Sequence, residues 1–198
     1  MHIDQSRKHQ RRFWLLLSGA VALGLGSGLI LARFFFGTSA EPIPAHSRIR
    51  DTVPVLEATT REVHLYFAGS NGGHLHAEER RIHAADTLCA AESIVTALLK
   101  GPKSPNLISP FPSASRLRNL FVTDNGTAYV DCTAELCRLH PGGVTAERLT
   151  LYAIVNSLVL NLEEVDRVQI LLEGKPAATL AGHLDIRRTK TANLLIIR

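Results

Sequence analysis

A run of twenty residues without a charged side chain, from Phe13 to Ala32, constrains this chain more than any other feature. A helix rises about 1.5 Å per residue, so the run would span about 30 Å, the thickness of a bilayer's hydrocarbon core. Aromatic side chains, which favour the membrane interface, stand near both ends: Phe13, Trp14, Phe34, Phe35 and Phe36. The run therefore predicts a transmembrane helix over residues 13–36.

The charges that flank this run predict its orientation. Residues 1–36 hold five basic side chains and one acidic side chain, and four of the basic ones precede the run. Because basic flanks stay on the cytoplasmic side, we expect residues 1–12 to form a cytoplasmic tail and the rest of the chain to lie outside. A cleaved signal peptide is the alternative, since Thr38-Ser39-Ala40 offers small residues, but the apolar run exceeds the usual length of a signal-peptide core.

The whole net charge of +4 belongs to this N-terminal segment, because the remaining 17 basic and 17 acidic side chains balance. A nucleic-acid-binding domain needs a basic patch on its folded part, so we expect no nucleic-acid partner. Residues 37–60 contain three prolines and no periodic apolar pattern, which predicts a flexible tether. The folded domain is expected over residues 61–198.

Two β-hairpins and a helix are predicted in the first half of this domain. The hairpins turn at Asn71-Gly72-Gly73 and at Asp124-Asn125-Gly126, since both sequences favour positive φ. Between them, apolar residues at helical spacing predict a helix that Asp86 caps and Gly101-Pro102 ends.

A second, long helix is predicted after Thr145, which is expected to cap it. Val168 and Ile170 then begin a strand, and further strands are expected over residues 179–186 and 194–197. The predicted order is β-β-α-β-β-α-β-β. It indicates an α+β domain in which an antiparallel or mixed sheet carries both helices on one face.

The sequence has three cysteines, Cys89, Cys132 and Cys137. Disulfides persist outside the cytoplasm. A bridge between Cys132 and Cys137 would close a short loop and would stabilise the fold by about 2 kcal/mol. A Cys132–Cys137 disulfide is therefore a candidate. Cys89, among apolar helix positions, is expected to be a small core residue.

Histidines and acidic residues suggest one metal hypothesis. His74 and His76 would point to the same face of a strand, with His83, Glu78 or Glu79 as further zinc ligands, which a His-metal hydrolase would need. A polar, solvent-facing edge strand explains the same residues, so we assign no metal ligand. His183 is expected to be structural in its turn, and Asp131 and Asp185 to cap strands or turns. No catalytic or cofactor-binding residue is assigned.

The second predicted helix is apolar over most of its circumference. Leu149, Tyr152 and Val159 lie off its main apolar stripe. Either the helix is buried between a sheet and a loop, or these three residues form a subunit-facing strip suited to assembly.

Several stretches of the domain together resemble the GerMN domain, named for bacterial spore-germination and sporulation proteins. They are VHLYFAGSNGGHL from Val63, ALLKGP from Ala97, PFPSASRLRNLFVTDNGTAYVDCTAEL from Pro110, ERLTLYAIVNSLVLNLEEVDRVQILLEGK from Glu147 and GHLD from Gly182. The resemblance covers about residues 61–188, in a single copy. It implies an α+β domain similar to the ring-building modules of bacterial envelope machines, without catalytic residues.

Taken with the apolar run, the resemblance predicts a single-pass protein of the bacterial cytoplasmic membrane whose C-terminal domain is periplasmic or otherwise extracytoplasmic. We expect a non-catalytic binding or assembly module of the cell envelope that needs no cofactor. Its expected partners are the membrane and a second copy or another envelope protein. A periplasmic module that binds an envelope polymer or small ligand is the first alternative, and the His-metal hydrolase is the second.

Overall fold

The computed structural model describes residues 58–198. The predicted cytoplasmic tail, the transmembrane helix and nearly all of the tether lie outside these residues. Within the described part of the chain, no helix is both long and apolar enough to cross a membrane.

The first sheet is built on the hairpin of β1 (Thr59–Gly69) and β2 (Leu75–Ala84), which pair antiparallel along their length. Its turn confirms the predicted chemistry, because Gly72 and Gly73 have φ of 67° and 89°, which favour glycine. A two-residue strand, β3 (Leu107–Ile108), pairs with the end of β1 and gives the order β2-β1-β3.

Helix α2 (Thr87–Lys100) begins and ends where the sequence predicts. The Asp86 side chain accepts a hydrogen bond from the Cys89 amide at 2.7 Å, which satisfies a free N–H of the first turn. Gly101 ends the helix with φ of 92°, a conformation that disfavours side chains.

The second sheet contains β4 (Leu117–Val122), β5 (Thr127–Cys132), β6 (Arg167–Leu172) and the two-residue β7 (Lys175–Pro176), in that order. β5 and β6 are parallel and the other pairs are antiparallel, so this sheet is mixed. The parallel pair requires a long crossover, which contains α3 (Glu135–Arg138) and α4 (Val144–Val159). Gly143, with φ of 88°, precedes α4, so the helix begins before the predicted cap at Thr145.

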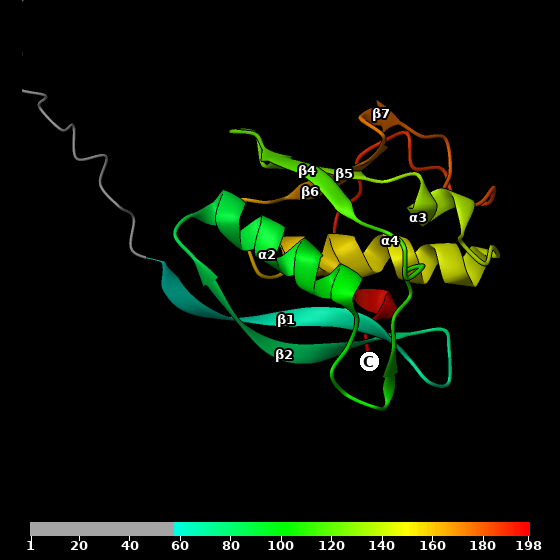
Figure 1. Ribbon diagram of the computed structural model, residues 1–198, viewed down its shortest axis with the longest axis horizontal. Coiled ribbons are helices and arrows are strands. Elements are labelled where there is room, and N and C mark those ends of the chain that lie inside the picture. The colour runs from blue at the N-terminus through cyan, green and yellow to red at the C-terminus, as the bar shows by residue number, and fades with distance from the viewer. Residues whose placement is uncertain (1–57) are drawn as a thin grey trace, which may run out of the picture. The chain divides into compact units, whose positions relative to one another are not determined.

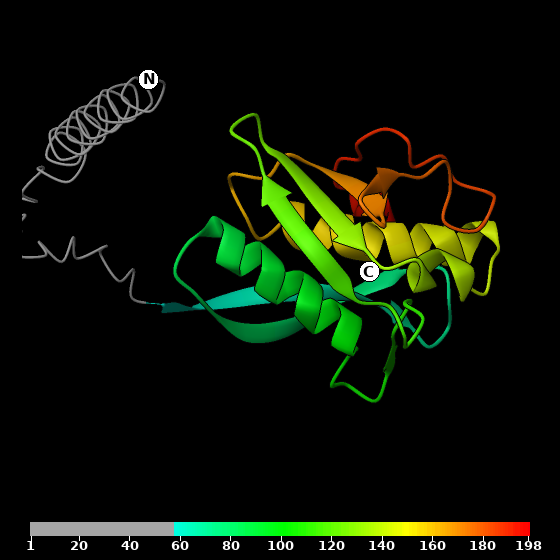
Figure 2. The same ribbon diagram turned by 45° about the horizontal axis from the view of Figure 1, so that its top comes forward.

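The two helices lie between the two sheets (Figure 1), so the expectation of one sheet with helices on one face was wrong. α2 contacts β1, β2 and β4, while α4 contacts β1 and β6. The physical reason lies in α4, because a helix that is apolar over most of its circumference needs cover on more than one side. Figure 2 shows the β4–β5 hairpin crossing over α2, with its turn extending beyond the helices.

The C-terminal segment also differs from the prediction. Residues 179–186 form an irregular loop, and Leu194–Ile196 form a short 3-10 helix in place of a strand. Three apolar side chains hold this segment to the core, each at most 3% exposed: Leu180, Ile186 and Ile196. Leu180, Ile186 and Ile196 are therefore buried as separate contacts, and apolar residues in a sequence do not by themselves distinguish such contacts from strand pairing.

Candidate functional site

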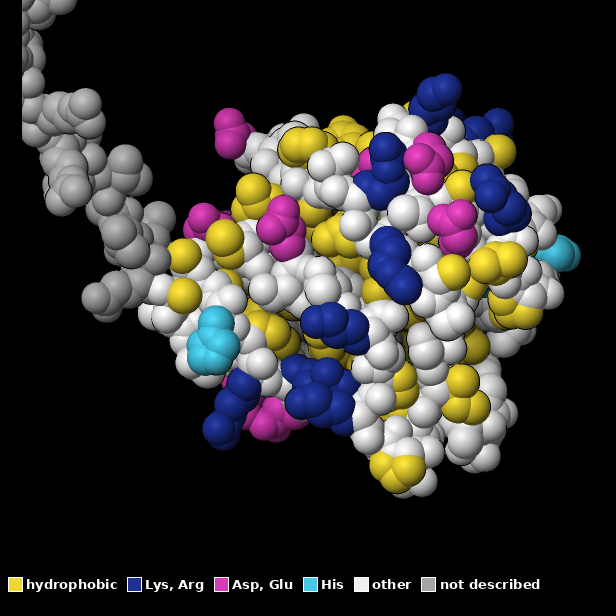
Figure 3. Space-filling model, in the orientation of Figure 1, with side chains coloured by type: hydrophobic (Ala, Val, Ile, Leu, Met, Phe, Trp, Pro, Cys, Tyr) yellow, Lys and Arg dark blue, Asp and Glu magenta, His cyan; other side chains and the backbone are white. Residues whose placement is uncertain are grey.

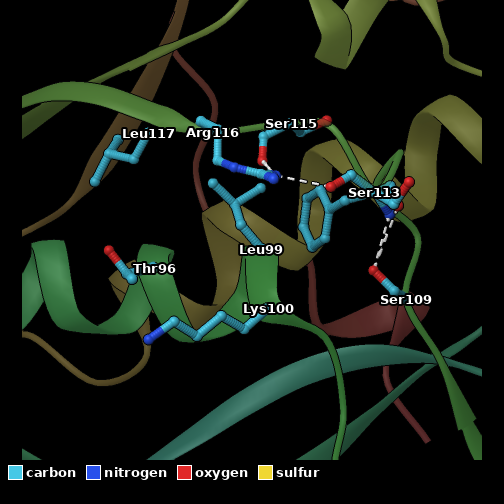
Figure 4. Close-up of a pocket in the computed structure, with 9 residues that line it drawn as sticks. Thr96, Leu99, Lys100, Ser109, Ser113, Ser115, Arg116 and Leu117 are labelled. Carbon is cyan, nitrogen blue, oxygen red and sulfur yellow. Dashed lines mark hydrogen bonds between the residues drawn. The ribbon is translucent and has the colours of Figure 1, made fainter.

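A cavity of about 530 Å³ opens between the C-terminal end of α2, the loop of residues 109–115 and the start of β4 (Figure 4). We call it the α2-end cavity. Its apolar wall and its polar rim come from nine residues: Thr96, Leu99, Lys100, Ser109, Phe111, Ser113, Ser115, Arg116 and Leu117. Its volume lies in the range typical of small-ligand sites.

Local hydrogen bonds shape the loop that forms one side of this cavity. The Arg116 guanidinium donates from one nitrogen, Nη1, to the carbonyls of Ser113 and Ser115, at 2.7 and 2.8 Å. The Phe111 amide donates to Ser109 Oγ at 3.3 Å. The Phe111 side chain is 6% exposed and packs in the core. Both this packing and the hydrogen bonds therefore hold the loop in place.

Two positive charges stand at this cavity without acidic partners. Among residues 58–198, neither Lys100 nor Arg116 forms an ion pair, whereas nearby Arg118 pairs with Asp131 at 2.8 Å. Lys100 lies in the last turn of α2, where the helix dipole favours a cation. In Figure 3, Lys and Arg side chains lie beside hydrophobic surface in the middle of the face shown, with acidic side chains also close by. The site is thus suited to a negatively charged group attached to an apolar one.

Ser115, a residue in the wall of the cavity, carries a buried and unsatisfied hydroxyl. The residue is wholly buried, and its Oγ has no hydrogen-bond partner among the described residues. Buried hydroxyls are normally paired, and an unpaired one costs about 1–3 kcal/mol. Because this Oγ has almost no accessible surface, it lies within the wall of the cavity and does not face the open space.

A second, acidic groove of about 830 Å³ lies at the other end of α2. It is lined by five carboxylates, none of which forms an ion pair among residues 58–198: Asp86, Asp124, Glu163, Glu164 and Asp166. The Cys89 amide holds the pKa of Asp86 below its usual value. The two ends of one helix therefore carry opposite charge.

The structure does not bring three of the proposed metal ligands together. The Glu78 carboxylate accepts hydrogen bonds from the amides of Lys103 and Ser104, at 2.9 and 2.8 Å, and its neighbour Arg80 pairs with it. His83 lies 3.1 Å from the Thr60 hydroxyl. Within residues 58–198 there is no group of three or more His, Cys, Asp or Glu side chains placed to hold a metal ion.

His74 and His76 do lie close together, at a small hollow of about 270 Å³ beside Arg198. His183 has the structural role expected of it, because its amide and its ring nitrogen both contact the Glu147 carboxylate. Asp131 caps the β6–β7 turn by accepting from the Gly174 amide at 2.7 Å, and Asp185 pairs with Arg187 within its own turn.

The candidate disulfide is absent from the structure, where all three cysteines are free thiols. Cys132 is wholly buried in the core, whereas the Cys137 thiol donates to the carbonyl of Leu180. The two side chains thus face different surroundings, which sequence spacing does not reveal. Cys89 is exposed, so the expectation of a core position for it was wrong.

The candidate interface on the second helix becomes part of the domain's own core. Leu149 is 7% exposed, and Tyr152 and Val159 are partly buried against the core cluster. Because α4 lies between two sheets, Leu149 is covered within the molecule, while Tyr152 and Val159 are covered only in part. Most of α4 is therefore buried, as the first alternative expected, but a second sheet provides part of the contact that was expected from a loop.

The sequence analysis did not identify Lys100, Ser115 or Arg116 as site residues. They come from a helix end and from a loop, with no motif that joins them. The one signal in the sequence was indirect, because Lys100 and Arg116 lie inside two of the stretches that resemble the GerMN domain. Their convergence on one cavity depends on how α2 packs against β4.

The fold and this cavity define a class: an α+β domain with two helices between two sheets and a preformed cavity at one helix end. The family model of Germane, described as sporulation and spore germination, matches residues 64–178, more than half of the chain. The chain belongs to the Germane family, and the resemblance to the GerMN domain is confirmed.

Three solved structures share the fold. A candidate lipoprotein from Clostridium perfringens is 19% identical, with a TM-score of 0.50 over 69% of this chain and 89% of that one. The first GerMN domain of the Bacillus subtilis sporulation protein GerM is 14% identical, with a TM-score of 0.52 over 67% and 97%.

The tandem GerMN domains of GerM are 16% identical, with a TM-score of 0.56 over 67% of this chain. This chain spans only 46% of that tandem structure. A search of curated proteins by sequence found no match.

Proposed function

We propose that this protein is a membrane-tethered, extracytoplasmic and non-catalytic binding module of the bacterial cell envelope. The observation that carries the binding role is the α2-end cavity, where two cations without an ion-pair partner among residues 58–198 stand beside an apolar wall. A preformed hollow that combines apolar surface with a few polar groups is typical of a ligand or partner site. In this proposal residues 1–12 are cytoplasmic, residues 13–36 span the membrane and residues 37–60 form the tether.

The placement outside the cytoplasm rests on the apolar run of residues 13–36 and its basic flank. The similar structures support an envelope role, since one is a candidate lipoprotein and two belong to a sporulation protein. Whether the role is in sporulation is a separate matter, and the binding proposal does not require it.

The exposed thiol of Cys89 offers a direct test of this placement. In a Cys137→Ser background, protoplasts treated with a membrane-impermeant maleimide are expected to label the chain before lysis. The matched control adds Cys89→Ser, which should abolish labelling because Cys132 is wholly buried. Labelling that appears only after lysis would place the domain in the cytoplasm and contradict the proposal.

The binding role is tested separately by photo-crosslinking in the native cells. A photoreactive residue at Ser113, on the rim of the cavity, is expected to yield a discrete crosslinked product. The control carries the same residue at exposed Arg188, which does not line the cavity. Equal yields from the two positions, or none from Ser113, would remove the basis for a binding site there.

Self-assembly is a second candidate function, and the opposite charges at the two ends of α2 favour it. Helix α2 is about 21 Å long, so a contact between the acidic groove of one copy and Lys100 and Arg116 of the next would be head-to-tail. Such a contact would repeat from copy to copy.

Light scattering on residues 41–198 across a range of concentrations tests this candidate. The measured mass should rise with concentration at low salt and fall as salt screens the charges. Reversal of Lys100 and Arg116 to Glu should give a monomer, and further reversal of Asp124 and Glu163 to Lys in the same chain should restore assembly. A monomer under every condition would exclude self-assembly through this contact.

A further inference from the structure

We infer that the free edge of β2 pairs with the same edge of a second copy, so that two domains join their first sheets into one antiparallel sheet. In this dimer Glu79 of each copy lies opposite Arg81 of the other. The pairing is symmetric and ends at two copies, whereas a head-to-tail contact through the ends of α2 would continue. It uses a different surface from the α2-end cavity and does not depend on what that cavity binds.

Strand β2 is the outermost strand of the first sheet and has β1 on one side only (Figure 1). The register pairs Glu79 with His64. The N–H and the carbonyl of His64 both bond to the Asn161 side chain, on the side of β1 away from β2. In an antiparallel pair, opposite residues either bond to each other or both turn their backbone groups outward. The backbone groups of Glu79 therefore point to the free edge of β2.

The same alternation gives every second residue of β2 a free N–H and a free carbonyl: Ala77, Glu79, Arg81 and His83. None of these backbone groups has a hydrogen-bond partner among residues 58–198. The series ends at Leu75, whose carbonyl accepts from the Arg198 amide at 2.9 Å. Two hollows, of about 640 and 400 Å³, lie along residues 78–81 and 81–83. Most of the edge thus faces open space.

Charge distinguishes the registers in which two such edges can pair. Three symmetric registers use at least three of the four free residues. One is centred on Glu79 and one on Arg81, and each places two identical charges opposite each other, which is unfavourable. The third is centred on Arg80 and places each Glu79 opposite Arg81 of the other copy. It also pairs Ala77 with His83, so all four free residues of both copies are used.

The side chains of Glu79 and Arg81 are available for this contact. Both are exposed, and neither forms an ion pair among residues 58–198. A hydrogen bond to Glu62, together with the negative charge of that group, raises the pKa of Glu79. Two acidic groups therefore lie side by side on the exposed face of the sheet, and Arg81 of a second copy adds a positive charge beside them.

Charged side chains on an edge strand often prevent pairing between molecules, which is the alternative explanation for β2. Charges of one sign would repel a second copy in every register, but residues 78–81 read Glu-Glu-Arg-Arg, an order that is complementary to itself when antiparallel. The like-charge contact at the centre, between the two Arg80 side chains, is weakened. Each Arg80 already pairs with Glu78 and donates to the Gly101 carbonyl of its own copy at 3.2 Å.

Charge reversal in the full chain tests this register. Glu79→Arg and Arg81→Glu each create two like-charge pairs in the dimer, so each variant alone should dimerise at least about tenfold more weakly than wild type. An equal mixture of the two variants should restore the dimer, because opposite charges then meet at both positions. The matched control is Arg188→Glu, which makes the same charge change at an exposed residue outside β2 and should leave dimerisation unchanged.

Native mass spectrometry of the full chain, released from detergent micelles over a range of concentrations, counts the copies. It also separates the mixed dimer from the two homodimers, since the two variants differ in mass. A dimer that survives both single reversals is held by another surface and would overturn the inference. A monomer at every concentration would overturn it as well.

Hydrogen exchange tests whether the contact is strand pairing. The amides of Ala77, Glu79, Arg81 and His83 should exchange more slowly as the fraction of dimer rises. The intervening amides of β2 already bond to β1 and should change less. A dimer without this protection would contradict the inference. Protection that appears only when other envelope proteins are added would assign the edge to a different partner and would also contradict it.

Discussion

Glu147 is a wholly buried carboxylate that fixes the loop after β7 to helix α4. It accepts hydrogen bonds from the amides of His183 and Leu184, both at 3.0 Å, and lies 2.6 Å from the ring nitrogen of His183. Burial alone would raise the pKa of Glu147, but these donors outweigh burial and hold the pKa below its usual value. One side chain thus provides hydrogen-bond acceptors for two backbone amides of an irregular segment.

This geometry predicts an acid-sensitive loop. Because the folded-state pKa of Glu147 is lowered, its stabilising effect is present above pH 4.5 and is lost as the pH falls through the lower, folded-state value. Glu147→Gln should reduce the free energy of unfolding at pH 7 by about 1.5–3 kcal/mol, the value of hydrogen bonds to a charged group.

Urea titrations at a series of pH values between 7 and 3 would measure both effects. The difference between wild type and Glu147→Gln should shrink toward the acidic end of the series. A constant difference across the whole range would show that the charge of Glu147 has no part in holding the loop.

At the scale of elements, the free edge of β1 is protected by side chains from the end of α4. The Asn161 amide both accepts from the His64 N–H and donates to the His64 carbonyl, each at 2.8 Å, as a neighbouring strand would. Ser157 accepts from the Tyr66 amide at 3.0 Å. An unpaired edge can recruit another strand, and these contacts prevent that without adding a strand.

Asn161→Ala should therefore lower the free energy of unfolding by about 1–3 kcal/mol, because it leaves the backbone groups of His64 unpaired. Hydrogen exchange should accelerate at the His64 amide more than at the amides between β1 and β2. The control is Asn106→Ala, which changes an exposed asparagine that bonds to no other described residue. Equal destabilisation by both substitutions would contradict the edge-capping role.

The cap of α2 provides a second prediction at this scale. Asp86→Ala should cost about 1 kcal/mol of stability, because the Cys89 amide loses its acceptor, while Asp86→Asn should cost much less. Thermal unfolding of the two variants would measure the difference. If both variants melt together well below wild type, the charge of Asp86 matters and its hydrogen bond does not.

At the scale of the whole molecule, the layered core determines how the three thiols behave. Burial raises the pKa of Cys132 to about 12, so this thiol is unreactive while the domain is folded. Cys89 is exposed and Cys137 is partly exposed, although an adjacent Asp86 carboxylate raises the pKa of Cys89.

Iodoacetamide should therefore label Cys132 only when the whole domain unfolds. In the folded chain Cys89 is labelled first, and Cys132 reacts only at the rate at which the whole core opens. Denatured protein that has never met a reductant should take up three labels by mass spectrometry. A single label would show that Cys132 and Cys137 are bonded after all.

The order of most elements could be predicted from local sequence, because their causes are local. Asn71-Gly72-Gly73 determines a turn through positive φ, and Asp86 and Gly101 determine the ends of α2 through capping. The family followed from the same ordered stretches. The predictions failed where apolar residues have two explanations, as for Leu180 and Ile186, which are buried without strand pairing.

The candidate site, by contrast, was decided by tertiary structure. Sequence alone placed hydrophobic residues around α4 but could not say whether a second sheet or a second subunit covers Leu149, Tyr152 and Val159. The sequence also gave no reason to assign Lys100, Ser115 and Arg116 to one site, because they lie on different elements that come together only in the folded domain. Whether a charged side chain has an ion-pair partner, and whether a hydroxyl has a hydrogen-bond partner, depend on packing. Here the packing of α2 against β4 determines both.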